Sequence, residues 1–420
     1  MIYSIPFIYF LCLFIYVYKK RGLDIASYTI SLYVITSFCT ILIMWFDYKP
    51  YSQIETSLLS TFLYCFLLTI CIVPLIKMNT NKIQHITCAN PKFIDLLVFL
   101  YFSVFVILLL AYWHDLITLL LSNDWDRMRN LLYHGEDIAI SRYGGITEKF
   151  LVPIRVISLT SSIMFLIFFY AICFMKKPVY YYFMALLGSL PMVFIGILGI
   201  DRSKTFYWII LLGLMYSFFW NKIPSKRKKV IYFVLLCFVG IAATYIAIVT
   251  ISRFGYRNEG TEGGIIVYAG QPYLFFCDFT TNWENPEGFT TKILFPATHK
   301  YIIHDYVGMV PYQEWLSMKT HKFCGQFYTF LGSHYLAGNW IGVFSFILLY
   351  LSIVSFFVGK LNRHIVKFKN VFISYFIILV VPTGCILYYY THPPMMLDVL
   401  LLIVLCLLYH RGMTIKRELL

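Results

Sequence analysis

Charged residues are scarce in this 420-residue sequence: Asp, Glu, Lys and Arg make up 13% of it, whereas hydrophobic residues make up 60%. Soluble domains carry about 25% charged residues, so a globule of this composition has too little polar surface to face water. The mean hydropathy of +0.75 agrees with this. The shortage of charge excludes a soluble protein and indicates an integral membrane protein.

Motifs for nucleotides and metal clusters are absent. The sequence contains no G-x-x-x-x-G-K and no G-x-G-x-x-G, so it offers no phosphate-binding loop for ATP or a nucleotide sugar. Its 11 cysteines include no C-x-x-C pair, which argues against a zinc cluster or a disulfide framework. We therefore expect no cofactor and no bound metal. A disulfide between Cys277 and Cys324 stays open, because both lie in one predicted outer loop.

Long hydrophobic runs are what the sequence does have. Eleven runs suit helices that cross a hydrocarbon core of roughly 30 Å, and they are apolar on every side, unlike the alternating strands of a barrel. They lie near 2–18, 26–46, 56–76, 94–112, 150–175, 179–199, 205–220, 230–250, 336–358, 370–390 and 398–409. With no internal repeat or linker, residues 1–420 are expected to form one all-α, polytopic helical bundle.

The basic residues divide unevenly between the two faces of this bundle. The formal net charge is +14, and 20 of the 34 Lys and Arg lie on alternate loops that hold only three acidic residues. Positively charged loops stay in the cytoplasm, so the N-terminus is predicted outside and the C-terminus inside. The basic excess is a topology signal, and we expect no nucleic-acid partner.

Two predicted outer loops are large, about 113–149 and about 251–335. Binding and catalytic groups concentrate in such loops. In the first, Ser122, Asn123 and Asp124 can cap an amphipathic interfacial helix, which we favour. The alternative is a D-x-D metal site at Asp124 and Asp126.

Outer basic residues at the ends of spans are the candidate binding groups. Arg202 and Lys204 lie in a short hairpin between two spans, and Arg253 and Arg257 follow the eighth span at i, i+4 spacing. On a continued helix both guanidiniums share one face, and Arg forms bidentate, charge-assisted hydrogen bonds with phosphate. These residues are therefore predicted to bind a lipid diphosphate.

The alternative is that these side chains snorkel to the interface or pair with Asp201, Glu259 or Glu262. Arg142, just before the fifth span, is a weaker candidate. Arg155, inside that span, is expected to face the interior of the bundle.

Candidate catalytic bases also fall in the second outer loop. Histidine is a natural general base near neutral pH, and His321 is the best placed by sequence, ahead of His334 and Asp278. Asp278 ends an aromatic segment, 268–279, whose rings can stack on sugars.

The many-span layout, the two large outer loops and the arginine pair that opens the second loop resemble the O-antigen polymerases, the Wzy-type oligosaccharide repeat-unit polymerases of bacteria. Two local runs carry the same resemblance. They are Gly-Gly-Ile-Ile-Val-Tyr-Ala-Gly-Gln-Pro-Tyr-Leu-Phe-Phe at 263–276 and Phe-Leu-Gly-Ser-His-Tyr-Leu-Ala-Gly-Asn-Trp-Ile-Gly at 330–342.

The resemblance covers most of the chain and implies a GT-C-like bundle in the bacterial inner membrane. It implies a glycosyltransferase that acts on undecaprenyl-diphosphate-linked oligosaccharides, with a chain-length regulator protein as a candidate partner and with Arg202, Arg253 and Arg257 on the diphosphate. The related O-antigen ligases carry a His in the large loop, which His321-Lys322-Phe323 matches only loosely.

The implied reaction makes a surface polysaccharide by direct displacement. A sugar hydroxyl of a new repeat unit attacks the anomeric carbon of the growing chain, and undecaprenyl diphosphate leaves. Two alternatives stay open: an O-antigen ligase, with lipid A core as acceptor, and a polysaccharide flippase or transporter. Transporter sites lie between repeated, broken helices, and the sequence shows no repeat.

Overall fold

The computed structural model describes residues 2–49, 51–88, 90–121, 146–254, 263–282, 288–295, 298–305, 309–321, 328–386 and 404. Contacts group the chain into two compact units. Unit 1 comprises Met1–His85 and Ile265–Met396, and unit 2 comprises Ile86–Gly264 and Leu397–Leu420. Each unit combines segments that are distant in sequence.

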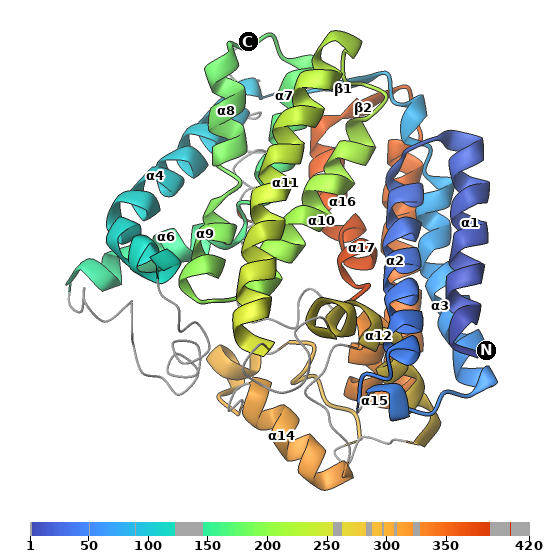
Figure 1. Ribbon diagram of the computed structural model, residues 1–420. Helices are drawn as coiled ribbons and strands as arrows, with labels where there is room; N and C mark the ends of the chain where they lie inside the picture. Colours follow the sequence, from blue (N-terminus) through green and yellow to red (C-terminus); the bar gives the residue numbers. More distant parts are fainter. Residues whose placement is uncertain are drawn as a thin grey trace. The chain divides into compact units, whose positions relative to one another are not determined.

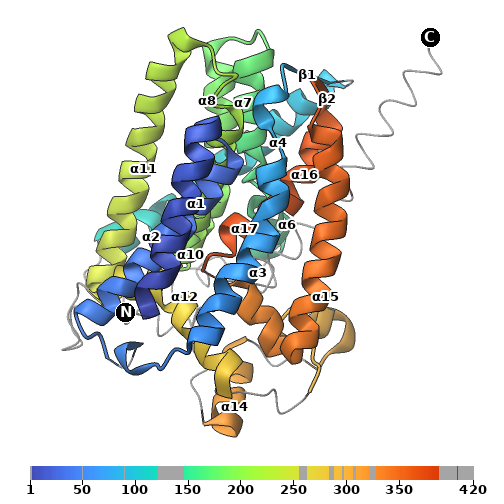
Figure 2. The same ribbon diagram turned by 90° about the vertical axis from the view of Figure 1, so that its right-hand side faces the viewer.

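Unit 1 begins with three helices that lie side by side (Figures 1 and 2). They are α1 (Ile5–Arg21), α2 (Ile25–Trp45) and α3 (Leu58–Lys77). Its later helices are α12 (Gly263–Asn282), α14 (Met309–Thr320), α15 (Thr329–Leu361), α16 (Phe368–Ile378) and α17 (Val380–Thr383). Its short elements are η1 (Ile2–Ser4), η2 (Tyr51–Gln53), η3 (Thr80–Lys82), the π-helical turn η5 (His299–Ile303), and β2 (Ile365–Lys367), which pairs with β1 (His85–Thr87).

Helix α12 lies within the segment that the sequence assigns to an outer loop, and it packs into unit 1. Thr40 Oγ1 of α2 donates to the Gly270 carbonyl at 2.7 Å, and the Tyr273 hydroxyl lies 2.6 Å from Thr61 Oγ1 of α3. A Cβ atom at Gly270 would lie 2.6 Å from the backbone of Cys39 and Thr40. The absence of a side chain at Gly270 therefore permits this close approach between α12 and α2.

In the part of unit 2 that the structure describes there are seven helices. They are α4 (Pro91–Leu121), α6 (Ile146–Leu159), α7 (Ile163–Phe174), α8 (Val179–Leu187), α9 (Pro191–Leu198), α10 (Arg202–Phe219) and α11 (Ser225–Phe254). The span predicted at 150–175 is bent by 60° between α6 and α7, and the span predicted at 179–199 is interrupted between α8 and α9.

Polar side chains at and around these two interruptions form hydrogen bonds with the backbone and with one another. Ser161 Oγ donates to the Ser189 carbonyl at 3.1 Å, and Trp208 Nε1 donates to the same carbonyl at 3.1 Å. Tyr101 and Thr160 share a hydrogen bond of 2.5 Å. Broken helices are tolerated within a membrane where neighbouring groups satisfy the freed backbone in this way.

The long apolar helices confirm an all-α membrane protein but not the predicted number of spans. In the described part of the chain, seven helices are long and apolar enough to cross a membrane, or eight if the bent pair α6 and α7 forms one span. Helix α10 and the shorter apolar helix 368–383 fall outside that group, and the last predicted span, 398–409, lies outside the described residues apart from Val404.

The loops that the sequence assigns to the cytoplasmic face contact one another within each unit. In unit 1, Arg21 donates to the Met78 carbonyl at 3.3 Å, and Asn362 donates to the Lys77 carbonyl at 3.0 Å. In unit 2, Lys177 Nζ lies 2.8 Å from Asp95 Oδ1. Each unit therefore gathers these loops at one end.

Candidate functional site

The start of α10 places Arg202 and Lys204 at one end of unit 2. Asp201 caps the helix: its Oδ1 accepts from the Ser203 backbone N–H at 2.9 Å and from the Ser203 hydroxyl at 2.5 Å. Lys204 Nζ lies 3.8 Å from the other oxygen of Asp201. A helix N-terminus attracts negative charge, and two cationic side chains in the first turn add to that attraction.

Arg202 also connects α10 with α11. Its Nη1 donates to Thr250 Oγ1 at 2.5 Å. Thr250 lies one turn before Arg253, and α11 continues through Arg253 to Phe254. The structure therefore brings Arg202, Lys204 and the backbone of Arg253 to the same end of unit 2. Arg257 and Arg142 lie outside the described residues.

Arg155 contributes a further cation to unit 2, on α6. It donates from Nη2 to the hydroxyl of Tyr112, and its guanidinium carbon lies 5.6 Å from the centre of that ring. Tyr112 is buried in a core cluster with Ile154 and Phe194. Arg155 therefore contacts the interior of the unit, as expected of a cation within a span.

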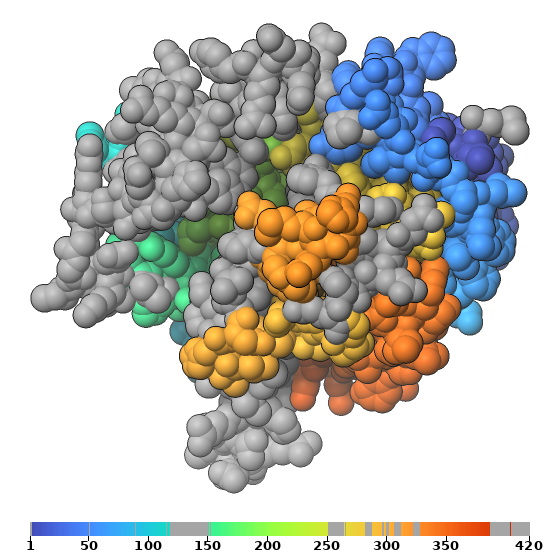
Figure 3. Space-filling model, turned by 90° about the horizontal axis from the view of Figure 1, so that it is seen from below, coloured from blue at the N-terminus to red at the C-terminus, as the bar shows by residue number. Residues whose placement is uncertain are grey.

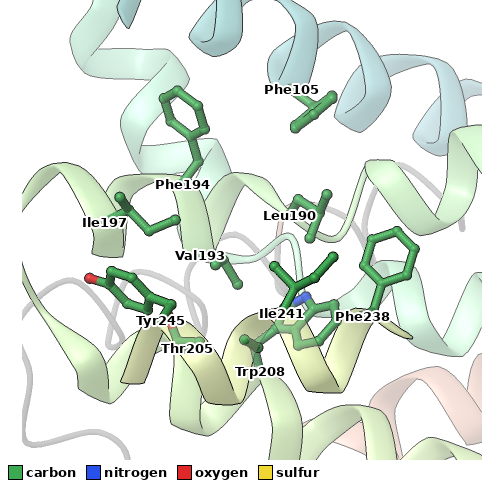
Figure 4. Close-up of a pocket in the computed structure, with 11 residues that line it drawn as sticks. Phe105, Leu190, Val193, Phe194, Ile197, Thr205, Trp208, Phe238, Ile241 and Tyr245 are labelled. Carbon is green, nitrogen blue, oxygen red and sulfur yellow. The ribbon is translucent and has the colours of Figure 1, made fainter. Parts of the chain in front are cut away.

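An apolar pocket of about 300 Å³ lies beside these helices in unit 2 (Figure 4). Its walls come from α4, α9, α10 and α11, and they include Phe105, Phe194, Trp208 and Phe238. Thr205 also lines it, one turn along α10 from Arg202. The Thr205 hydroxyl is buried and has no hydrogen-bond partner among the residues that the structure describes.

The three predicted bases lie in different surroundings within unit 1. His334 is buried in α15, where Nδ1 donates to the Phe330 carbonyl at 2.7 Å and the ring centre lies 3.9 Å from that of Phe346. His321 is exposed just after α14, with a positive φ of 54°. In Figure 3, α14 is seen in orange on the face toward the viewer. Asp278 is half-buried on α12.

The aromatic rings around Asp278 belong to the core of unit 1. Tyr273, Phe276 and Phe279 are buried, and the Tyr273 ring lies 5.0 Å from that of Tyr64. The suggestion that the rings of this segment stack on sugars is therefore wrong for these three, because Tyr273 and Phe276 pack against Tyr64 of α3 and Phe279 packs against Tyr328. Cys277 is a buried free thiol, and Cys324 lies outside the described residues.

A further histidine that the sequence did not single out makes two side-chain hydrogen bonds in unit 1. His299 Nδ1 lies 2.8 Å from Asp305 Oδ1, and His299 Nε2 lies 2.8 Å from Thr291 Oγ1. The three residues come together because the η5 turn folds the chain back on itself. A hydroxyl eight residues before the histidine and a carboxylate six residues after it match no motif, so no sequence pattern points to these three residues.

The described residues contain no group of three or more His, Cys, Asp or Glu side chains that could hold a metal ion. The D-x-D at Asp124 and Asp126 lies outside them. The histidine and Asp278 candidates belong to unit 1, whereas Arg202, Lys204 and Arg253 belong to unit 2.

Comparison of the chain with models of protein families, with curated proteins and with solved structures found no match.

Proposed function

We propose that this protein is a glycosyltransferase that polymerises undecaprenyl-diphosphate-linked oligosaccharide repeat units into a surface polysaccharide, an O-antigen or a capsule. It acts at the outer face of the bacterial inner membrane. The observation that carries the proposal is the basic start of α10 beside the apolar pocket of unit 2. Within four residues, α10 presents Arg202, Lys204 and the pocket-lining Thr205.

This arrangement suits an anionic headgroup that carries a hydrocarbon chain. Arg202 and Lys204 supply charge-assisted donors for phosphate oxygens, and Arg253 begins the next turn of α11 after Thr250. The walls of the pocket are apolar enough for part of a lipid chain. A lipid diphosphate combines these two properties.

The reaction requires mainly that the protein align donor and acceptor and stabilise the charge of the leaving diphosphate. A diphosphate is already a good leaving group, so cations that stabilise its developing charge lower the barrier. Holding donor and acceptor together removes much of the entropic cost of their encounter. The reaction therefore needs no ATP, and a chain-length regulator protein is a candidate partner that would set how many units are joined.

A lipid-linked glycan transporter is the second candidate function, and the interrupted helices of unit 2 favour it. Transporters form their sites where spans are broken. Here the Ser161 and Trp208 side chains both donate to the Ser189 carbonyl at the interruption between α8 and α9. An O-antigen ligase is the third candidate, because it uses the same donor.

The test is elongation by the purified protein in liposomes that contain undecaprenyl-diphosphate-linked repeat units. The polymerase produces a ladder of longer lipid-linked chains on a gel. A transporter moves the repeat unit between leaflets and joins none, and a ligase forms product only when lipid A core is added. Either of these two results would replace the proposal.

Two arginine variants test whether formation of the polymer depends on binding of the diphosphate. Arg253→Ala and Arg257→Ala should each lose polymer, because truncating a charge-assisted phosphate contact costs roughly 1.5 to 3 kcal/mol. Lys should rescue only in part, since it lacks the planar fork. Arg227→Ala is the matched control, because this arginine donates to the Ile172 carbonyl at 3.2 Å on the predicted cytoplasmic side. If Arg253→Ala and Arg257→Ala both make full-length chains, the diphosphate binds elsewhere in the protein.

A further inference from the structure

The Asp305, His299 and Thr291 side chains form a continuous chain of hydrogen bonds in unit 1, with both links at 2.8 Å. An ionised carboxylate only accepts hydrogen bonds, so the Nδ1 atom of His299 carries the proton that points to Asp305. The Nε2 atom of a neutral imidazole in this tautomer has a lone pair. That lone pair accepts from the Thr291 hydroxyl, and Nε2 is therefore set up as a base.

Backbone bonds hold the three residues in place. The Asp305 N–H donates to the His299 carbonyl at 3.2 Å, which closes the η5 turn, and the Phe295 N–H donates to the Thr291 carbonyl at 2.8 Å. The Thr290 N–H donates to the Ala337 carbonyl of α15 at 2.6 Å. The cluster is thus fixed to a long helix of unit 1, as a catalytic group needs to be.

The charge of the cluster also suits a base. The hydrogen bond from His299 lowers the pKa of Asp305 below its ordinary value of 3.8. Asp305 therefore stays ionised at neutral pH. An ionised carboxylate on Nδ1 fixes the tautomer of the imidazole and stabilises the cation that forms when Nε2 takes a proton.

The surroundings of the cluster suit a substrate that is anchored in a membrane. Ile302 and Ile303 are 73% and 53% exposed, and the rings of Phe289 and Phe295 are exposed as well. Such apolar side chains in a predicted outer segment are stable at a membrane surface. The diphosphate end of a lipid-linked sugar lies close to that surface.

We propose that His299 is the catalytic base that deprotonates the acceptor sugar hydroxyl, with Asp305 as the positioning residue and with Thr291 as the hydroxyl that holds Nε2 until the acceptor binds. This inference rests on the proposed function. The acceptor oxygen forms a bond to the anomeric carbon of the donor while its proton passes to His299 Nε2. The bond between that carbon and the diphosphate oxygen breaks, and undecaprenyl diphosphate leaves with the electron pair. The proton then passes from the imidazolium to solvent.

Thr291 occupies the position that the acceptor hydroxyl takes in the reaction. Its Oγ1 stands 2.8 Å from Nε2, which is the distance expected between a base and the hydroxyl that it deprotonates. The acceptor therefore displaces the Thr291 hydroxyl from Nε2 when it binds. Thr291→Val removes this competitor without changing the size of the side chain.

The experiment measures elongation rates of the purified protein in nanodiscs with undecaprenyl-diphosphate-linked repeat units, and in parallel the binding of the donor lipid. His299→Asn keeps an N–H donor near Asp305 but has no atom in the place of Nε2. We expect kcat to fall by roughly 10²-fold to 10⁴-fold, with KM and donor binding unchanged. Thr291→Val should raise kcat/KM for the acceptor, because the acceptor hydroxyl no longer has to displace the Thr291 hydroxyl from Nε2.

Asp305→Asn tests positioning separately from folding. We expect a lower kcat, a shifted pH profile of kcat and an unchanged thermal midpoint. His304→Asn, at an exposed left-handed position that Asn tolerates, is the matched control and should behave as the native protein. Imidazole added to a His299→Gly variant should restore part of the rate.

The outcomes separate this inference from the proposed function. If the native protein makes no polymer, the proposed function is wrong, and the assignment of His299 as its base is wrong with it. If the native protein makes polymer and His299→Asn makes it at the native rate, the base is elsewhere. Loss of activity in His321→Ala together with full activity in His299→Asn would overturn the inference in favour of His321.

Discussion

Nη1 of Arg202 donates to Oγ1 of Thr250 at 2.5 Å, and this bond joins the first turn of α10 to the last turns of α11. The Thr250 hydroxyl in turn donates to the Ile246 carbonyl at 2.6 Å. Thr250 thus orients a guanidinium that has five N–H donors, of which this bond uses one. Because the Thr250 hydroxyl is neutral, this bond orients the guanidinium without itself neutralising its charge.

Variants of these two residues distinguish phosphate binding from packing. Arg202→Ala should lower the elongation rate by roughly 10-fold to 100-fold, as expected for a lost charge-assisted contact. Thr250→Val removes only the orienting bond, and should lower the rate by less than about 10-fold. Initial rates in liposomes measure both. Equal losses in the two variants would show that Arg202 acts by joining the helices.

The predicted topology is tested by reporter fusions. Fusions after Lys229 and after Glu287 should report opposite sides of the membrane, because the first follows a strongly basic loop and the second lies in the large outer segment. The loop contacts within each unit fit this alternation. Identical signals from the two fusions would remove the case for chemistry outside the cell.

Gly270→Ala should destabilise unit 1. The added Cβ would lie 2.6 Å from backbone atoms of Cys39 and Thr40, and a packed backbone does not move as a flexible side chain does. Overpacking of this kind costs about 1 to 3 kcal/mol, which thermal unfolding in detergent will show as a lower midpoint. Gly240→Ala is the control, because an added Cβ there meets nothing within 4 Å. A midpoint for Gly270→Ala equal to that of the control would show that α12 is not held this closely.

Lys222, in the turn between α10 and α11, should make stability rise with pH. Burial lowers the pKa of Lys222 from 10.5 to about 8. Between pH 8 and pH 10.5 the unfolded chain therefore binds more protons than the folded chain, so the free energy of unfolding increases with pH across that window. Lys222→Met should remove the rise of the thermal midpoint with pH over the same range. The same substitution at the exposed Lys226 should leave that rise in place. A flat profile in the native protein would contradict the burial of a charged Lys222.

Elongation should not require a divalent cation. We expect the purified protein to extend lipid-linked units in excess chelator, and the double variant Asp124→Ala and Asp126→Ala to stay active. The physical reason is that the cationic side chains already supply the charge that a metal would bring to a diphosphate. Activity that chelator abolishes and a divalent cation restores would move the site to the first large outer loop.

Hydropathy predicted the existence of the long apolar helices well, because a bilayer demands continuous apolar runs. It could not show the bend at Ser158–Ser162, since an average over some 20 residues hides a few serines and threonines whose hydroxyls bond locally. It also missed α12 as a packed helix. There Gly270, Gln271 and Pro272 lower the apolar content of a segment that the structure buries against α2 and α3.

In the candidate site, too, some residues could be named from the sequence and others could not. Arg202 and Lys204 were predicted because cations at the ends of spans are rare and costly, which makes them visible in one sequence. His299 was not, because its hydrogen-bond partners Asp305 and Thr291 are brought to it by a π-helical turn without a regular spacing. His321 as the base stays a prediction, which the His299 experiment addresses.

The turn between α1 and α2 has a consequence for how the chain enters the membrane during synthesis. Only Gly22, Leu23 and Asp24 separate the two helices, and Asp24 caps α2 through a 2.8 Å bond from the Ser27 N–H while lying 3.8 Å from Arg21. Two long apolar helices joined this tightly can leave the ribosome as one hairpin and partition together into the lipid. The neutralised, capped turn then remains on the side where it was made, so the charges of Arg21 and Asp24 are not carried across the membrane.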